Sequence, residues 1–237
     1  MIFQIADLLI SVPITGGKFV SRYVPYLSNS DEPADIVVNE QDFRLNLYSK
    51  ELSEDYAIYT ETYRQFVLGL LNYHGFCLHA CALEYEGKAY LFSGPCGIGK
   101  STHARLWKSL FGPKVHVIND DKPAIRLIDN QWYAYGTPWC GKDGIHLNTK
   151  APIAGLCFLK QDASNYIIKC EAKDVLGLFI SQTFHRYRDL EDLEKMTSML
   201  EQFCKDIPLY VLHNNAEDEA ALLSFKTMII GSEKNEK

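Results

Sequence analysis

A run of glycines, a lysine and a serine near the middle of the sequence has the composition of a phosphate-binding loop. Gly94-Pro95-Cys96-Gly97-Ile98-Gly99-Lys100-Ser101 fits the pattern G-x-x-x-x-G-K-[ST] at every fixed position. Glycines let successive backbone N–H groups turn inward around phosphate oxygens, and a helix that follows presents its positive end to the same anion. In such a loop Lys100 reaches the β- and γ-phosphates and the Ser101 hydroxyl coordinates Mg²⁺.

The residues on both sides of this run fit the same interpretation. Residues 89–93 are apolar and predict a strand that feeds the loop, and THARLWKSLF after it has helical periodicity that ends at Gly112-Pro113. The sequence therefore predicts a nucleotide site with Mg²⁺. Its contact residues are Gly94, Pro95, Cys96, Gly97, Ile98, Gly99, Lys100, Ser101 and Thr102.

Two adjacent carboxylates follow the next predicted strand. The apolar residues of 115–118 run directly into Asn119, Asp120 and Asp121, so the acidic pair lies at a strand end, where a carboxylate can sit beside Ser101. One carboxylate can hold Mg²⁺, directly or through water, and the other can take a proton from an incoming hydroxyl. The alternative is a pair of solvated turn acids, but the position after a phosphate-loop helix favours a functional pair.

His79 lies in the predicted strand 76–83, before the strand that feeds the loop. A histidine among apolar neighbours is more often a hydrogen-bonded core residue than a catalytic one. Cys77, His79 and Cys81 alternate and could share one strand face, but neighbours on one strand converge poorly on a tetrahedral zinc ion. The seven scattered cysteines argue against a disulfide framework and favour free thiols in a reducing cytoplasm.

Two further segments could complete a phosphoryl-transfer site. The loop Gly136–Lys142 contains a cation and could close over a γ-phosphate, or it could be a turn packed by Trp139. Arg186 and Arg188 could clamp a phosphate or carboxylate, or they could lie on a solvated helix face.

Composition limits the class of protein. The 237 residues are 47% hydrophobic, which is enough for a sizeable core, and the net charge is −6. No block of Lys and Arg indicates a nucleic-acid surface, and no run of about 18 apolar residues indicates a membrane span. The N-terminal MIFQIADLLISV lacks a basic region and is interrupted by Asp7, so we expect a first strand rather than a signal peptide.

The remaining pattern predicts an α/β fold. We expect extended segments within 1–50, a helix over 55–73 with an aromatic stripe used for core packing, and a hairpin around Asp129-Asn130. Strands are predicted at 153–159 and 166–170. The chain from Asp174 onward is predicted to be mainly helical, with one strand at 209–212. We expect N-terminal strands and a helix packed on the core over 1–73, a phosphate-loop domain over 74–231 and a frayed tail at 232–237.

The order of His79, SGPCGIGKST and INDD resembles the catalytic domain of bacterial HPr kinase/phosphorylase and its small-kinase relatives. That group shares the phosphoenolpyruvate carboxykinase-like variant of the P-loop fold, a mixed sheet with flanking helices. The resemblance covers roughly residues 75–180 and is strongest at the loop. The phrase GTPWCGK is similar to a subgroup of HPr-kinase-related proteins sometimes labelled as ATP-type phosphoenolpyruvate carboxykinase.

The resemblance implies a role for each matching residue. Asp120 matches the general base, Asp121 the magnesium-linked acid, and His79 a histidine near the transferred phosphate, while Lys100 keeps its loop role. ATP as the nucleotide also follows from the resemblance, which is compatible with a homo-oligomer. The sequence departs from the family at Thr102, where the kinases typically have Glu, and residues 1–70 do not resemble the extra domain of the regulatory kinases.

These observations predict a kinase that uses ATP and Mg²⁺ to phosphorylate a hydroxyl. The acceptor is expected to be a serine in a peptide or protein, or a small hydroxylated metabolite. Two alternatives remain open at this point: an ATP-type phosphoenolpyruvate carboxykinase, and a sensor or partner protein that binds ATP without chemistry.

Overall fold

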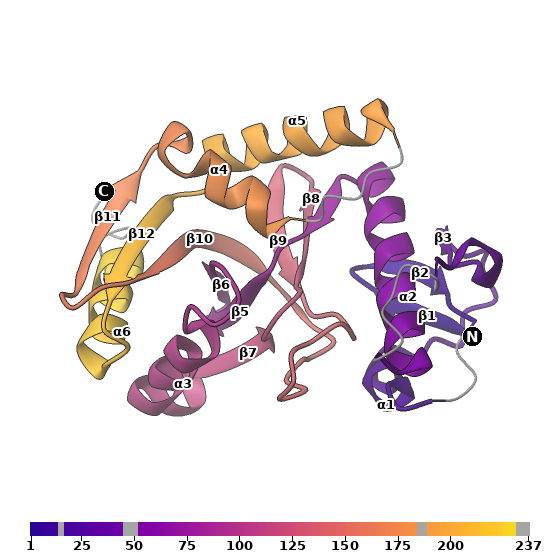
Figure 1. Ribbon diagram of the computed structural model, residues 1–237, viewed down its shortest axis with the longest axis horizontal. Helices are drawn as coiled ribbons and strands as arrows, with labels where there is room; N and C mark the ends of the chain where they lie inside the picture. Colours follow the sequence, from indigo (N-terminus) through magenta and orange to yellow (C-terminus); the bar gives the residue numbers. More distant parts are fainter. Residues whose placement is uncertain (14–16, 45–51, 184–188, 231–237) are drawn as a thin grey trace.

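The computed structural model describes residues 1–13, 17–44, 52–183 and 189–230 (Figure 1). The predicted arginine pair, Arg186 and Arg188, and the predicted tail at 232–237 lie outside these residues. The described chain is a mixed α/β structure in which helices flank a large, curled mixed sheet, as the sequence predicts. A small N-terminal sheet with its own helices packs beside it.

The large sheet contains both parallel and antiparallel pairs. Its strands are hydrogen-bonded in the order β4-β8-β9-β10-β6-β5-β7, with β12 beside β10 and β11 beside β12. β10 pairs parallel with β6 and β12, and the other pairs are antiparallel. The strands are β4 Gly75–Cys77, β5 Ala80–Tyr85, β6 Lys88–Ser93, β7 Val115–Asn119, β8 Ala124–Ile128, β9 Gln131–Tyr135, β10 Lys150–Gln161, β11 Tyr166–Cys170 and β12 Leu209–Asn214.

β10 joins two parts of this sheet. Its first three residues, Lys150 to Pro152, pair antiparallel with β9, whereas Ile153 to Phe158 pair parallel with β6. The register shifts between Ile153 and Gly155, and an irregularity of this kind lets a strand bend. Figure 1 shows β10 as a long curved strand that crosses the middle of the molecule.

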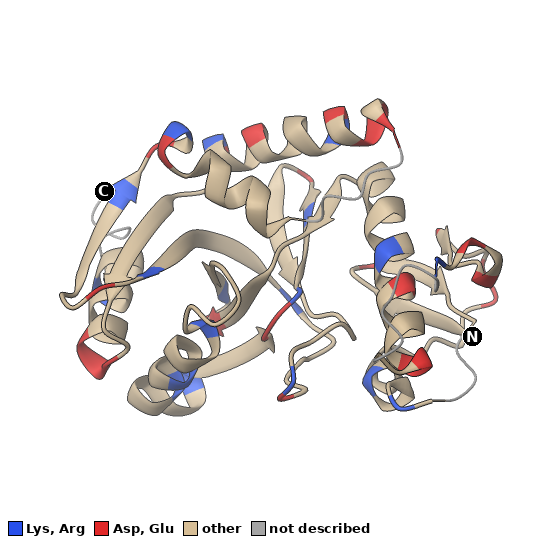
Figure 2. Ribbon diagram, in the orientation of Figure 1, with Lys and Arg blue, Asp and Glu red and all other residues tan. Residues whose placement is uncertain are grey.

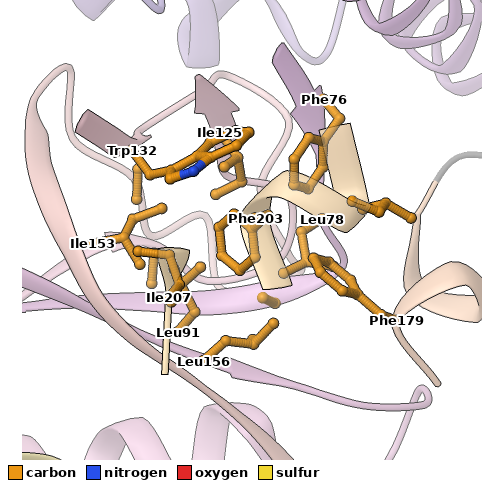
Figure 3. Packing of buried hydrophobic residues seen from close by; sticks show 14 of the residues in the cluster. Phe76, Leu78, Leu91, Ile125, Trp132, Ile153, Leu156, Phe179, Phe203 and Ile207 are labelled. Atoms are coloured by element: carbon orange, nitrogen blue, oxygen red, sulfur yellow. The ribbon is translucent and has the colours of Figure 1, made fainter. Parts of the chain in front are cut away.

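Alternating side chains place a separate core on each face of the sheet. Leu91 and Phe158 pack with Phe179 and Phe203, from α4 and α5, whereas Phe92 packs with Trp107 of α3. A strand buried on both faces reads as a continuous apolar run, as in AYLF of β6. Figure 3 shows the first of these clusters. The helices are α3 Lys100–Phe111, α4 Ala172–Gln182, α5 Leu190–Asp206 and α6 Asp218–Phe225.

The N-terminal residues form a second, smaller sheet. β1 and β2 make an antiparallel hairpin, and β3 adds to β2 in parallel. Phe66 stacks on Trp139 with ring centroids 4.6 Å apart, so the N-terminal part shares a core with the segment that follows β9. The predicted boundary near residue 73 stays a prediction. The elements are β1 Ile2–Ile5, β2 Leu8–Ser11, α1 Val20–Tyr23, β3 Ile36–Val37 and α2 Glu54–Leu70.

Short helical turns occur at several junctions. In the described residues, the 3₁₀ turns are η1 Val24–Tyr26, η2 Glu40–Asp42, η4 Leu71–Tyr73 and η5 Gly112–Lys114, and η6 Lys226–Ile230 is a π-helical turn.

Several predicted elements are confirmed. The predicted helix over 55–73 is α2, which begins where Ser53 Oγ accepts a hydrogen bond from the Tyr56 backbone N–H. Its stripe packs into the core, with Phe66 and Leu70 fully buried. The predicted hairpin is β8–β9, and its turn residues Asp129 and Asn130 have φ angles of 49° and 61°.

The predicted strand over 76–83 is wrong, because the chain breaks at Leu78 and His79 into two strands. β4 pairs with β8, and β5 pairs with β6 and β7. Between them the backbone N–H groups of Leu78 and His79 donate to Pro123 O and Gln182 O. Cys77 and Cys81 therefore lie in different strands. Similarly, Glu40–Asp42, within the region 1–50 where extended segments are expected, forms the short helical turn η2 instead.

Charged residues are dispersed over the described surface (Figure 2). Acidic and basic residues are interspersed along α5, as expected for a solvated helix face. No helix in the described part of the chain combines the length and the apolar composition needed to cross a membrane.

Candidate active site

The predicted phosphate loop lies between β6 and α3. Gly97 and Gly99 have φ angles of 81° and 107°, a conformation that side chains with a Cβ rarely adopt. Gly99 is the N-cap of α3, and no side chain makes a cap hydrogen bond there. The N-cap residue of α3 thus has no side-chain acceptor that would compete with an anion for the first backbone N–H groups of the helix.

Lys100 is the buried cation of this loop. Its Nζ donates to the carbonyl oxygens of Gly94, at 2.8 Å, and Pro95, at 3.2 Å. Burial lowers the pKa of Lys100, partly offset by the charge of Asp121. The loop residues Pro95, Cys96 and Gly97 are exposed, so a ligand can reach them.

Asp120 lies beside the first turn of α3. It shares a small cavity of about 60 Å³ with Ser101, and Cys81, Ala104, Val117 and Ile145 give this cavity a mainly apolar lining. Thr102 is exposed on the same helical turn. Asp120 follows β7, which is separated from β6 by β5 alone, and α3 packs against β5 and β7. This packing brings the carboxylate next to the loop.

Burial raises the pKa of Asp120, and the neighbouring charge of Asp121 adds to the effect. The Gly141 backbone N–H donates to Asp120 Oδ1 at 2.6 Å, which partly offsets this rise. The Asp120 backbone N–H donates to Ile145 O at 3.2 Å. One carboxylate oxygen is therefore fixed by the backbone of the following loop.

Asp121 has a different environment from its neighbour. Its Oδ1 lies 3.2 Å from His79 Nε2, and its Oδ2 accepts a hydrogen bond from Lys122 Nζ at 2.5 Å. Burial alone would raise the pKa of Asp121, but the contacts with His79 and Lys122 lower it well below its usual range. Asp121 is therefore ionised under ordinary conditions.

His79 connects Asp121 to the phosphate loop. Its Nδ1 lies 2.9 Å from Gln182 Oε1, so both ring nitrogens face oxygen atoms. Its carbonyl oxygen accepts a hydrogen bond from Ser93 Oγ at 2.9 Å, and Ser93 is the residue directly before Gly94. The break between β4 and β5 places His79 here, which the strand pattern alone does not reveal.

Asn119 holds the turn that carries the two carboxylates. Its Oδ1 accepts hydrogen bonds from the backbone N–H groups of Asp121, at 2.9 Å, and Lys122, at 2.7 Å. Its Nδ2 donates to Thr137 O at 3.0 Å. A buried side chain with every polar group paired is costly to disturb, so this turn has a defined geometry. The composition of the turn, N-D-D-K, was a signal that could have pointed to Lys122.

The predicted loop over 136–142 is anchored to the protein. Trp139 is buried, which agrees with the turn interpretation, and its Nε1 donates to Tyr59 O at 3.2 Å. Residues 136 to 140 are buried, and only then does the chain reach the exposed Lys142. Lys142, the cation of this loop, is therefore exposed and follows a segment that is fixed by packing in the core.

The donor atoms at the site suit a hard cation that is also bound by a nucleotide. The expected ligands, Ser101 and Asp121, offer a hydroxyl and an ionised carboxylate, and Mg²⁺ typically takes only one or two protein ligands besides phosphate oxygens and water. Among the described residues, no group of three or more His, Cys, Asp or Glu side chains is placed to hold a metal ion by itself. Any magnesium here would depend on the nucleotide for further ligands.

Comparisons with known proteins find a distant similarity of fold. No protein-family model matches the sequence, and no curated protein matches it. Among solved structures, the HPr(Ser) kinase/phosphatase from Coxiella burnetii matches with a TM-score of 0.39 and 11% sequence identity. The match covers 68% of this chain and 97% of that one.

Proposed function

We propose that this protein is a phosphotransferase that uses ATP and Mg²⁺ to phosphorylate a hydroxyl group. The acceptor class is a serine in a peptide or protein, or a small hydroxylated metabolite. The observation that carries the proposal is the run Gly94–Ser101 at the start of α3, with Asp120 sharing a cavity with Ser101. A phosphate loop alone would support binding, whereas a buried carboxylate beside it supports proton transfer as well.

The two carboxylates are suited to different tasks. Asp120 has a raised pKa and one oxygen fixed by Gly141, so it is the better proton acceptor for an incoming hydroxyl. Asp121 has a lowered pKa and stays ionised, which suits an acid linked to magnesium. This division agrees with the roles that the resemblance implies for these two positions.

The remaining residues position and stabilise charge. Lys100 and the backbone N–H groups of the loop would hold the β- and γ-phosphates. His79 lies against Asp121, where it can orient that carboxylate, and the resemblance implies that it lies near the transferred phosphate. Ser101 and Asp121 would hold Mg²⁺, and the ion would neutralise charge on the phosphate oxygens when bound.

The first test is transfer of labelled γ-phosphate from ATP in the presence of Mg²⁺. The acceptor panel contains free serine, other hydroxylated metabolites and serine-bearing peptides. Wild type should transfer phosphate to at least one acceptor or, more slowly, to water. Asp120→Asn should bind ATP with little change and lose transfer by about a hundredfold or more, whereas Lys100→Ala should weaken ATP binding itself.

Three results would contradict the proposal. Full transfer by Asp120→Asn would remove the assigned base. Tight ATP binding with neither transfer nor hydrolysis would favour a sensor protein. Formation of phosphoenolpyruvate from oxaloacetate and ATP would favour a carboxykinase.

A further inference from the structure

The N-terminal part of the chain reaches the segment that holds Asp120. Arg22, in α1, donates from Nη1 to Cys140 O at 2.8 Å and from Nη2 to Gly141 O at 3.0 Å. These carbonyl groups belong to consecutive residues, so the planar guanidinium engages both at once. Arg22 is more than 110 residues distant in sequence from both partners.

The same peptide segment holds Asp120. Gly141 accepts a hydrogen bond from Arg22 through its carbonyl oxygen and donates its own N–H to Asp120 Oδ1 at 2.6 Å. A Cβ added to Gly141 would lie 3.1 Å from Asp120 Oδ2. The carboxylate thus lies directly against this backbone, and a shift of the segment would move or release it.

Tyr59 of α2 fixes Arg22 and the segment together. Its hydroxyl accepts a hydrogen bond from Arg22 Nη1 at 2.9 Å and from the Cys140 backbone N–H at 3.1 Å, and it donates to Pro138 O at 2.8 Å. The guanidinium also lies 5.2 Å from the centre of the Phe19 ring and 5.4 Å from that of Tyr59. Arg22 is therefore held from both sides.

We propose that Arg22 is a positioning residue for Asp120, and that the N-terminal part of the chain thereby completes the catalytic site. Arg22 acts through the backbone of Cys140 and Gly141, and Tyr59 supports it. The proposal rests on the proposed function where it concerns catalysis. The geometric part, that Arg22 controls the hydrogen bond between Gly141 and Asp120, stands independently of turnover.

The catalytic test compares three variants of the full chain. Arg22→Met keeps the unbranched stem and removes the guanidinium, Arg22→Lys keeps the charge without the two-pronged donor, and Lys18→Ala removes an exposed positive charge from the same segment as a control. The kcat and KM for MgATP are measured with the acceptor found above, or for hydrolysis. Arg22→Met should lower kcat by about 10- to 100-fold and leave KM within about twofold.

Arg22→Lys should recover part of the loss, because an ammonium group can donate to one carbonyl but does not match the pair. Lys18→Ala should behave as wild type. A general loss of structure would instead change KM and the urea midpoint together. Unchanged kcat in Arg22→Met, or equal losses in Arg22→Met and Lys18→Ala, would overturn the proposal.

The geometric test uses the Gly141 amide in ¹H–¹⁵N correlation spectra. An amide proton bonded to a carboxylate resonates downfield, and Asp120→Asn should move it upfield. Arg22→Met should move the same resonance in the same direction, and a Gly141 signal that does not move in Arg22→Met would refute the positioning role. If wild type shows no turnover at all, the proposed function fails, and this spectrum still decides the role of Arg22.

A milder variant covers the case in which Arg22→Met does not fold. Tyr59→Phe removes one hydroxyl that contacts Arg22, Pro138 and Cys140. It should shift the Gly141 amide and lower kcat in the same direction, by a smaller factor. Wild-type kcat and an unmoved Gly141 amide in Tyr59→Phe would count against the proposal.

Discussion

Adjacent residues of one type acquire opposite properties at this site. Asp120 and Asp121 share a turn, yet the pKa of the first is raised and that of the second is lowered. The pKa values differ because Asp120 is buried beside a cavity and accepts a hydrogen bond from one backbone N–H, whereas Asp121 contacts the side chains of His79 and Lys122. Two carboxylates with separated pKa values are a recurring arrangement for acid–base chemistry.

Cys96 provides a residue-level test of nucleotide binding that needs no acceptor. It lies in the proposed phosphate loop and is exposed, whereas Cys77, Cys81, Cys140 and Cys157 are buried and Cys170 and Cys204 are partly buried. Iodoacetamide should therefore alkylate Cys96 first. MgATP should slow this reaction by about tenfold or more when present at ten times its Kd, because it covers the loop.

Peptide mapping by mass spectrometry measures the rate at each cysteine. Cys204 serves as the internal control, since it lies on α5 away from the loop. Equal rates at Cys96 with and without MgATP would contradict binding at this loop. The variant Cys96→Ser should lose the fast phase of labelling.

The residues found from sequence and those missed differ in one physical respect. Gly94 to Ser101 are contiguous, and their spacing alone expresses the chemistry. Arg22 and Gln182 reach the site from distant parts of the chain, and their partners there are backbone carbonyls or a single side chain. The amino-acid sequence does not predict contacts of Arg22 with backbone carbonyl groups, because every residue has a carbonyl group of this kind.

At the scale of elements, the segment after β9 depends on a glycine. A Cβ on Gly136 would lie 1.7 Å from Leu147 O and 2.9 Å from Ile118 O, both backbone atoms. Gly136→Ala should therefore separate the 145–149 segment from β7 and destabilise the protein by about 3 kcal/mol or more. Urea unfolding followed by circular dichroism measures this change in the free energy of unfolding.

Gly177 is the matched control. It lies on the exposed side of α4, and a Cβ there would meet no atom within 4 Å. Gly177→Ala should stabilise the protein by about 0.5–1 kcal/mol, since alanine loses less backbone entropy in a helix. Equal effects at the two glycines would show that the close approach at Gly136 is not tight in solution.

Elements whose periodicity or turn residues lie within one segment could be predicted from the sequence. Elements that depend on hydrogen bonds to distant residues could not. α2 and the β8–β9 hairpin follow from periodicity and turn residues within a single segment. The break at Leu78 and His79 does not, because both flanking stretches are apolar and extended. It arises from hydrogen bonds to Pro123 and Gln182, which the local sequence does not contain.

At the scale of the whole molecule, polar contacts attach the N-terminal hairpin to the large sheet. Asp7, in the β1–β2 turn, accepts a hydrogen bond from Tyr135 Oη at 2.7 Å and pairs with Lys150. Arg126 donates to Ala6 O at 2.6 Å from the same side. These contacts join residues more than 110 positions apart.

The attachment should depend on pH through Asp7. Burial raises the pKa of Asp7. The hydrogen bonds from Lys150 and Tyr135 and the charge of Lys150 together lower the pKa by more than burial raises it, so the net shift is downward from 3.8. A lowered pKa in the folded state stabilises the protein above the unfolded value, and this stabilisation is lost as pH falls through the folded value. Asp7→Asn should cost about 1 kcal/mol or less at pH 7, since both charged groups are partly exposed.

The cost of Asp7→Asn should shrink towards zero as the pH falls below 3.8. Asparagine tolerates the φ of 58° at this position, so the variant isolates the charge. Urea unfolding at several pH values measures the difference, and Asp31→Asn, at an exposed aspartate, is the control. A cost that does not change with pH would show that the ion pair contributes nothing.

The dual pairing of β10 also governs when the chain can fold during synthesis on the ribosome. β10 lies between β6, from the first half of the chain, and β12, which begins at Leu209. Until residue 214 has left the exit tunnel, the backbone N–H and C=O groups of Leu156 to Gln161 that pair with β12 have no partner strand. Nascent chains paused before β12 should therefore bind holdase chaperones, and release should follow the arrival of that last central strand.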